Sequence, residues 1–374
     1  MAKFRYSAYQ LDGAGGVERL DIDLQFSGLT CDVNLSGVDA VRFTITPEYP
    51  RLQDAQGRLK IVPWKTLVIV ELGNQIVGGG IVSHVETSPF EVSIECVGHL
   101  GYYVEQPFVF PFDNPTPIAL VGSDPAKVFC YLLLAARTWP DANLGLKIDR
   151  SYSCDESLNI GNRRVDSDAE NDGPYVIGMH NTPSLYDRLL ELSELGSFDF
   201  FIDWSWRTDG TPKPIVRLIG DEDTRGTPLQ LTVGVNILEP PVRSTSDEYF
   251  NNVVLMGGGK GRKKLIVTST NSPDGRLSRT KIVHRPRVVN PKVAQRLANR
   301  LARKFSTNKR DGIEMVRVVD HPTAPLGQFK LAQLVTIFGP GKGYNQNYIE
   351  ERRIVGISYE PETDSAVLTL ADPA

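Results

Sequence analysis

Short runs of alternating or continuous apolar residues dominate the first hundred positions. Such runs predict β-strands when proline, glycine or serine interrupts them. The first run ends at Pro47, and the last two are joined by a turn at Ser88-Pro89. The four runs lie at 41–46, 67–72, 75–86 and 91–97. Together they predict a small barrel over 38–98.

The middle of the chain changes to a helical pattern. Ser123-Asp124-Pro125 supplies an N-cap and a first-turn proline for a buried helix over Ala126 to Thr138. A second helix is expected over 182–196, because leucines recur on one face and glycine ends the run. An aromatic-rich strand from Phe198 to Trp206 follows, and it is expected to pair as a hairpin with the strand at 214–219.

Strands near the two ends of the chain resemble each other at a constant shift of 275 positions. Val41-Arg42-Phe43 matches Val316-Arg317-Val318, and Val82-Ser83-His84 matches Ile357-Ser358-Tyr359. Two copies of a strand pattern, separated by an unlike segment, indicate two related small barrels in one chain. The alternative is a chance match between two antiparallel meanders.

These patterns predict a mainly β protein with an α+β insert, in which two related small β-barrel domains flank a mixed helical and strand middle domain. A length of 374 residues suits two or three domains at ~100–200 residues each. The expected boundaries are 1–105 for the first barrel, 106–245 for the insert and 246–374 for the second barrel.

Composition excludes several other classes. With 41% hydrophobic and 23% charged residues, the chain is a folded globular protein. The longest apolar stretch, Val128 to Ala136, is too short to span a bilayer, and no apolar region follows the basic start as in a secretory signal. The four cysteines form no C-x-x-C pair, so buried free thiols are expected.

Positive charge is concentrated between Lys260 and Arg310. This window has 16 Lys or Arg and one acidic residue, so it carries +15 while the rest carries −19 of the net −4. It includes a basic helix expected over 291–305. The surface of this basic window suits an acidic protein partner or DNA. The alternative is a solvated face without a partner. Nucleic acid is the weaker option, since Phe305 is the one aromatic residue available for stacking. The helix residues singled out for a partner or the DNA path are Arg296, Arg300, Arg303 and Lys304.

Tests for catalytic and metal motifs mostly fail. The glycine-rich segment 257–263 lacks the Gly-Lys-Ser/Thr ending of a phosphate loop. Asp168 to Gly173 has calcium-loop spacing, but Met179 stands where the bidentate glutamate belongs. Histidines show no metal-binding spacing, and no cofactor, metal site or catalytic residue is predicted.

The order of motifs resembles that of the tail hub proteins (minor tail or baseplate hub proteins) of long-tailed bacteriophages, especially those infecting actinobacteria. These motifs are structural patterns spread over nearly the whole chain, not catalytic signatures. The segments that carry the resemblance are 64–71, 78–82, 94–98, 124–129, 182–190, 353–359 and 367–370.

The resemblance implies a structural virion protein, and the missing catalytic motifs add the expectation that the chain is not an enzyme. It implies a homotrimer whose two barrels per chain form a pseudo-sixfold ring, joining the hexameric tail tube to the tail tip or fibre and letting DNA pass. The implied location is the virion tail tip, after assembly in the host cytoplasm, and the implied partners are distal tail, tape measure and tip or fibre proteins. Strand edges at Leu67, Ile69, Leu334 and Thr336 are then expected to be covered by neighbouring subunits.

Two rival functions stay open. A tail-associated peptidoglycan or glycan hydrolase would degrade isolated cell walls. A nucleic-acid-binding module using Lys260 to Arg310 would lose DNA binding steeply with added salt.

Overall fold

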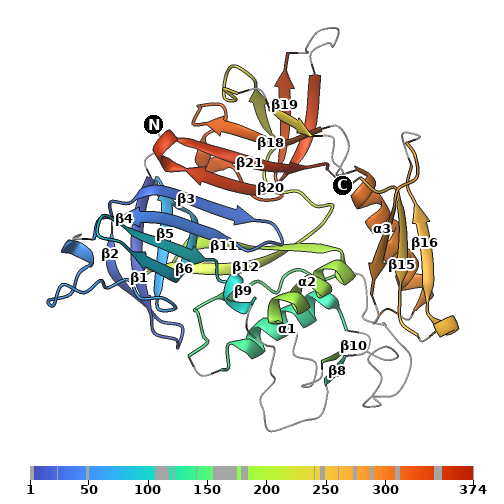
Figure 1. Cartoon of the computed structure of the whole chain (residues 1–374), viewed down its shortest axis with the longest axis horizontal. Coiled ribbons are helices and arrows are strands. Elements are labelled where there is room, and N and C mark those ends of the chain that lie inside the picture. Colours follow the sequence, from blue (N-terminus) through green and yellow to red (C-terminus); the bar gives the residue numbers. More distant parts are fainter. Residues whose placement is uncertain are drawn as a thin grey trace.

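The structure of the chain is a computed structural model, and it describes most of the 374 residues. The described residues are 4–22, 24–47, 50–104, 106, 118–120, 123–139, 141–154, 175–177, 184–239, 241–244, 249–259, 261–272, 276–285, 288, 290–307, 312–340 and 348–373. Over these residues the fold is mainly β with three α-helices (Figure 1).

A first β unit, drawn in blue in Figure 1, comes from the N-terminal hundred residues. Its strands are β1 (Phe4–Leu11), β2 (Val17–Ile22), β3 (Ser27–Asn34), β4 (Ala40–Ile45), β5 (Thr66–Leu72), β6 (Gln75–Thr87) and β7 (Val92–Val97). They pair antiparallel in the order β3-β4-β7-β6-β5-β1-β2. Gly78 lets β6 approach β3, because a Cβ there would lie 2.4 Å from the Cys31 sulfur.

A second β unit, drawn mostly in red, comes from the end of the chain. Its strands are β13 (Leu229–Thr232), β14 (Val242–Ser244), β18 (Gly312–Val319), β19 (Leu334–Gly339), β20 (Tyr348–Glu360) and β21 (Ser365–Ala371). The order β18-β21-β20-β19 repeats β4-β7-β6-β5 strand for strand, and every pair in both series is antiparallel. The predicted two-copy strand pattern is therefore confirmed.

The predicted shift of 275 positions is wrong in β6 and β20. Each of these strands has a bulge against its neighbour, at Ser83 in β6 and at Val355 in β20, and the two bulges are 272 positions apart (355 minus 83). An offset of three residues places matched side chains on opposite faces of the sheet. Short apolar strands match at several offsets, so the sequence alone did not fix the register.

The two units share one sheet. Residues 356–359 of β20 pair with residues 31–34 of β3, while the earlier part of β20 pairs with β19. Over the described residues, strand pairing closes neither unit into a barrel. The two predicted barrels are therefore not confirmed as closed barrels within the single chain. Strands β13 and β14, which precede the expected boundary at 245/246, pair with strands that follow it.

A middle unit packs two helices on a small sheet. Its elements are β8 (Ile118–Leu120), α1 (Pro125–Ala136), β9 (Lys147–Ile148), β10 (Tyr175–Ile177), α2 (Leu185–Gly196), β11 (Phe198–Trp206) and β12 (Pro212–Gly220). The Asp124 carboxylate accepts the Ala126 amide and the Ser184 hydroxyl accepts the Asp187 amide, so both helices begin at side-chain caps. The two predicted helices and the β11–β12 hairpin are confirmed.

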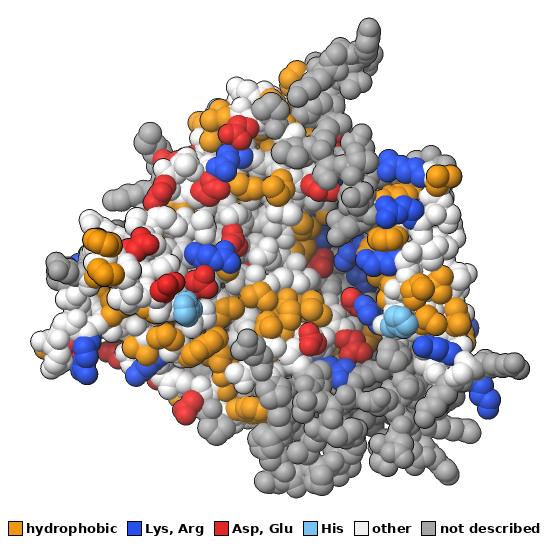
Figure 2. Space-filling view, viewed as in Figure 1, with side chains coloured by type: hydrophobic (Ala, Val, Ile, Leu, Met, Phe, Trp, Pro, Cys, Tyr) orange, Lys and Arg blue, Asp and Glu red, His pale blue; other side chains and the backbone are white. Residues whose placement is uncertain are grey.

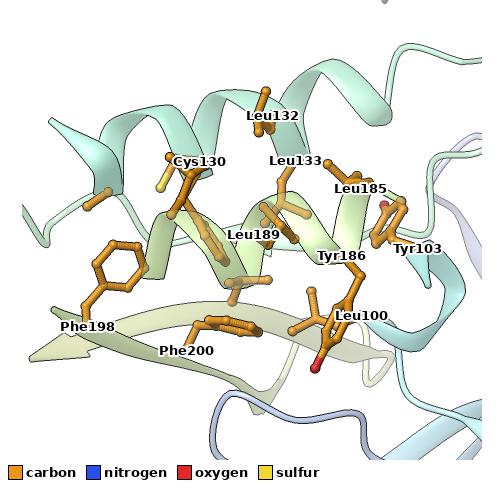
Figure 3. Packing of buried hydrophobic residues seen from close by; sticks show 14 of the residues in the cluster. Leu100, Tyr103, Cys130, Leu132, Leu133, Leu185, Tyr186, Leu189, Phe198 and Phe200 are labelled. Atoms are coloured by element: carbon orange, nitrogen blue, oxygen red, sulfur yellow. The ribbon is translucent and has the colours of Figure 1, made fainter. Parts of the chain in front are cut away.

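Aromatic and leucine side chains form the core of this unit. Figure 3 shows Leu133 of α1 beside Leu189 of α2, with Phe198 and Phe200 of β11 facing the helices. The Phe129 ring of α1 lies 5.1 Å from the Phe200 ring, and all five side chains are at most 1% exposed. Burial of this kind stabilises by about 1.5–3 kcal/mol per side chain, which holds β11 rigidly under the helices.

A fourth unit follows β14 and stands at the right of Figure 1. It consists of β15 (Asn252–Met256), β16 (Ile266–Thr270), β17 (Thr280–His284) and α3 (Pro291–Thr307). The helix predicted over 291–305 is thus confirmed. Its apolar stripe, which includes Leu297 and Leu301, is buried, and α3 packs on β15 and β16.

Several smaller points complete the comparison with the sequence. Strands β1, β2 and β3 were not predicted. All four cysteines are free, and three are buried, while Cys154 is partly exposed. No helix in the described part of the chain is long and apolar enough to cross a membrane. Short 3-10 turns lie at Pro50–Leu52, Gly101–Tyr103, Gly261–Lys263, Leu326–Gln328 and Pro361–Thr363.

Candidate interaction sites

The described residues contain no group of three His, Cys, Asp or Glu side chains that could hold a metal ion. The segment Asp168 to Gly173 lies outside the described residues. The glycine-rich segment joins β15 to β16: the Gly257 amide donates to the Leu265 carbonyl and the Leu265 amide to the Gly258 carbonyl. These bonds close the β15–β16 hairpin, so the segment is its turn.

The basic face of α3 lies against the acidic end of the middle unit. Arg300 donates from Nη1 to the Glu194 carbonyl at 2.6 Å and pairs through Nη2 with Asp221 at 2.6 Å. Arg285 pairs with the Glu194 carboxylate. Glu194 is in the last turn of α2, where the helix dipole adds negative potential. The acidic side chains that pair with Arg285 and Arg300 thus belong to the same chain.

The remaining predicted helix residues are more exposed. Arg303 pairs with Glu222 at 3.3 Å, and since both side chains are mostly exposed, this pair contributes little. Arg296 and Lys304 are exposed on α3. Figure 2 shows Lys and Arg side chains gathered on this side of the molecule, with Asp and Glu side chains close by. Of the four predicted residues, Arg300 therefore ties the fourth unit to the middle unit and Arg303 adds a weak surface pair, while Arg296 and Lys304 are exposed.

Phe305 is occupied by contacts inside the fourth unit. The Lys281 ammonium lies 4.1 Å from the centre of its ring, and the Phe250 ring lies 6.3 Å away. A ring covered by a cation on one side is a poor platform for a nucleic-acid base.

The predicted strand edges are interior strands. β5, which carries Leu67 and Ile69, lies between β1 and β6, and all its residues are buried. β19, which carries Leu334 and Thr336, lies between β20 and β13. Strands of the same chain cover both edges, so the prediction of open edges at these residues is wrong. β1 covers β5, and the sequence prediction did not include β1.

Asp199 joins three units at one point. The Ser36 hydroxyl of the β3–β4 turn donates to its Oδ1 at 2.9 Å, and Arg353 of β20 donates to its Oδ2 at 2.8 Å. The Ser36 amide also donates to the Phe200 carbonyl at 2.7 Å, and the Tyr186 hydroxyl donates to the Ser36 carbonyl. Sequence reasoning missed this junction. The sequence signal that could have revealed it is the Asp199 carboxylate, which lies in a strand rich in aromatic residues.

Two buried titratable residues of the first unit lie close to residues of the middle unit. Burial raises the pKa of Asp39 to about 7, although its carboxylate accepts the Asn34 amide at 2.8 Å. Burial lowers the pKa of His99 to about 4, and its ring packs edge-on against Trp204 of β11 at 5.3 Å. Burial at this contact therefore favours the uncharged form of both the Asp39 carboxyl group and the His99 imidazole.

Comparison with known proteins rests on structure, since no family model and no curated protein sequence matches the chain. The 43 kDa tail protein of prophage MuSo2 from Shewanella oneidensis aligns with a TM-score of 0.59 and 16% identity, over 99% of this chain and 98% of that one. The tail protein from Neisseria meningitidis MC58 aligns with a TM-score of 0.58 and 15% identity, over 99% and 96%. The chain has the fold of phage tail proteins.

A third phage structure agrees. The prophage tail protein gp18 from Listeria monocytogenes EGD-e aligns with a TM-score of 0.52 and 11% identity, over 98% of this chain and 94% of that one. The alignments cover whole chains, so the tail-protein fold includes all the units described above. The expected resemblance to phage tail proteins is confirmed at the level of fold.

Proposed function

We propose that the chain is a structural hub protein of a phage tail, working as a homotrimer. The observation that carries the proposal is the repeated strand order β4-β7-β6-β5 and β18-β21-β20-β19 within one chain that has the tail-protein fold. Three chains present six such units. A threefold ring of this kind can dock on a sixfold tube without six identical subunits.

The proposed ring joins the hexameric tail tube to the tail tip or fibre and lets DNA pass through its centre. In this proposal the 1–105 and 246–374 domains alternate around the axis as barrel-like units, and 106–245 lies between them. Distal tail, tape measure and tip or fibre proteins are the proposed neighbours, and the tail tip is the proposed location. Strands β2, β13 and β14, each paired on one side among the described strands, are the edges proposed for contacts between subunits.

The mass of the native oligomer tests this proposal. Three chains of 41.4 kDa give about 124 kDa, and native mass spectrometry at micromolar concentration should show this species. A chain that stays monomeric over that range and does not add to purified tails contradicts the trimer.

We propose a structural rather than an enzymatic role, since no described feature favours either rival. Arg285, Arg300 and Arg303 already pair with acidic side chains of the chain, which weakens the nucleic-acid alternative. Hydrolysis of isolated cell walls by the purified chain, abolished by one Asp or Glu substitution, would support the hydrolase instead.

A further inference from the structure

β11 is an edge strand of the middle unit. Among the described strands it pairs with β12 alone, and β9 pairs with the far side of β12. The Phe200 amide and carbonyl bond to Ser36, so the main-chain groups of Phe200 point away from β12. Alternate residues of a strand point the same way. The main-chain groups of Ile202, Trp204 and Trp206 therefore point to the same edge, where no other described strand pairs with them.

This edge borders a cleft where three units meet. A cavity of about 380 Å³ is lined by residues 202–206 of β11, by 74–77 at the start of β6 and by 329–331 of the second β unit. A second cavity of about 380 Å³ shares Asn74 and Trp206 with it. The two cavities adjoin at these two residues, and together they are called the groove. Grooves of this volume between domains are common ligand sites.

The two faces of β11 give the groove two different chemistries. Trp204 and Trp206 lie on one face, close to Ile76. Asp203 lies on the other face, where Arg225 and the exposed Lys330 also line the cavity.

The charge on the second face is positive overall. The Asp203 carboxylate is already paired with Arg217 at 2.6 Å and with Arg225 at 3.4 Å. Arg217 also pairs with Asp149 at 2.6 Å, so two arginines neutralise two carboxylates. Lys330 adds a further cation at the opening. One side of the groove is thus apolar and the other attracts an anion.

We propose that the free edge of β11 binds an extended peptide in which apolar and acidic residues alternate. The peptide adds to the β9–β12–β11 sheet as a fourth strand, with apolar side chains against Trp204 and Trp206 and carboxylates towards Arg225 and Lys330. Main-chain groups repeating at strand spacing fit a peptide better than a sugar chain. The inference goes beyond the tail role and does not depend on it.

The probe is an acetylated and amidated hexapeptide, Val-Glu repeated three times, titrated into the full chain. We expect saturable quenching of tryptophan fluorescence and slower hydrogen exchange, by at least about tenfold, at the amides of 202, 204 and 206. The amides of 201, 203 and 205, which face β12, should change little. A peptide with lysine in place of glutamate should bind at least about tenfold more weakly.

Two pairs of variants separate main-chain binding from side-chain binding. Trp206→Pro and Trp206→Val both lose the indole, but only proline loses the edge-facing amide, so Trp206→Pro should bind the probe about fivefold more weakly. Lys330→Gln should weaken binding, whereas Lys292→Gln on exposed α3 should not.

Three results would overturn the inference. One is no binding of the probe at millimolar concentration. Another is equal binding by the proline and valine variants. The third is protection of the same amides by an acidic polysaccharide such as polygalacturonate and not by the peptide, which would make the ligand a carbohydrate.

Discussion

Asp39 should make the chain less stable as the pH rises. Its pKa is about 7 in the folded chain and about 3.9 in an unfolded one, so between these values the folded state holds a proton that the unfolded state has lost. The stabilisation that Asp39 contributes is therefore complete below about pH 4 and is lost as the pH rises to about 7. A pKa difference of about three units, at 1.36 kcal/mol per unit, lowers the free energy of unfolding by ~4 kcal/mol over this range.

His99 should act in the opposite direction. Its pKa is about 4 in the folded chain and about 6.5 when unfolded, so stability is lost as the pH falls from 6.5 to 4, by ~3 kcal/mol. The two contributions nearly cancel between pH 4 and 6.5. Their separate effects should appear in variants that remove one group at a time.

The assay is urea unfolding from pH 4 to 8 at fixed protein concentration. Asp39→Asn keeps an oxygen acceptor for the Asn34 amide, and its stability should rise by ~3 kcal/mol from pH 4 to 6.5 through His99. His99→Phe keeps a ring beside Trp204, and its stability should fall by ~4 kcal/mol from pH 4 to 7 through Asp39. If Asp39→Asn follows the wild-type pH profile, the reasoning about burial is refuted.

Two further predictions concern the contacts between units, both measured by urea unfolding. Asp199→Ala leaves the buried Arg353 without its carboxylate and should cost about 3 kcal/mol or more; Arg353→Met in that background should recover part of the loss, and full additivity would contradict the pairing. Arg300→Glu places like charges beside Asp221 and should cost about 1–2 kcal/mol, recovered in part by Asp221→Arg, whereas Lys304→Glu on the exposed face should change stability by at most about 0.5 kcal/mol. Equal effects of Arg300→Glu and Lys304→Glu would contradict the contact between Arg300 and Asp221.

Local signals predicted the elements whose ends are set by nearby residues. Asp124 caps α1 two residues away, and the turn near Gly210 joins β11 to β12, so both lie within reach of a sequence pattern. The apolar stripe of α3 likewise fixed its buried face. The presence of two similar sets of strands followed from the same short-range patterns.

Long-range pairing lay beyond such signals. Bulges at Ser83 and Val355 changed the register of the repeat, and β1 covered an edge that the pattern left open. Asp199 and Arg353 are 154 positions apart, and a count of charges cannot show that Arg300 meets Asp221. Interaction sites built from such contacts need the fold before they can be recognised.

A cryo-electron microscopy reconstruction of the assembled oligomer tests the central claim most directly. The account predicts a threefold ring with an open centre, in which β4-β7-β6-β5 of one copy and β18-β21-β20-β19 alternate at one level as six similar units. A reconstruction with the two units at different levels along the axis, or without threefold symmetry, would contradict it.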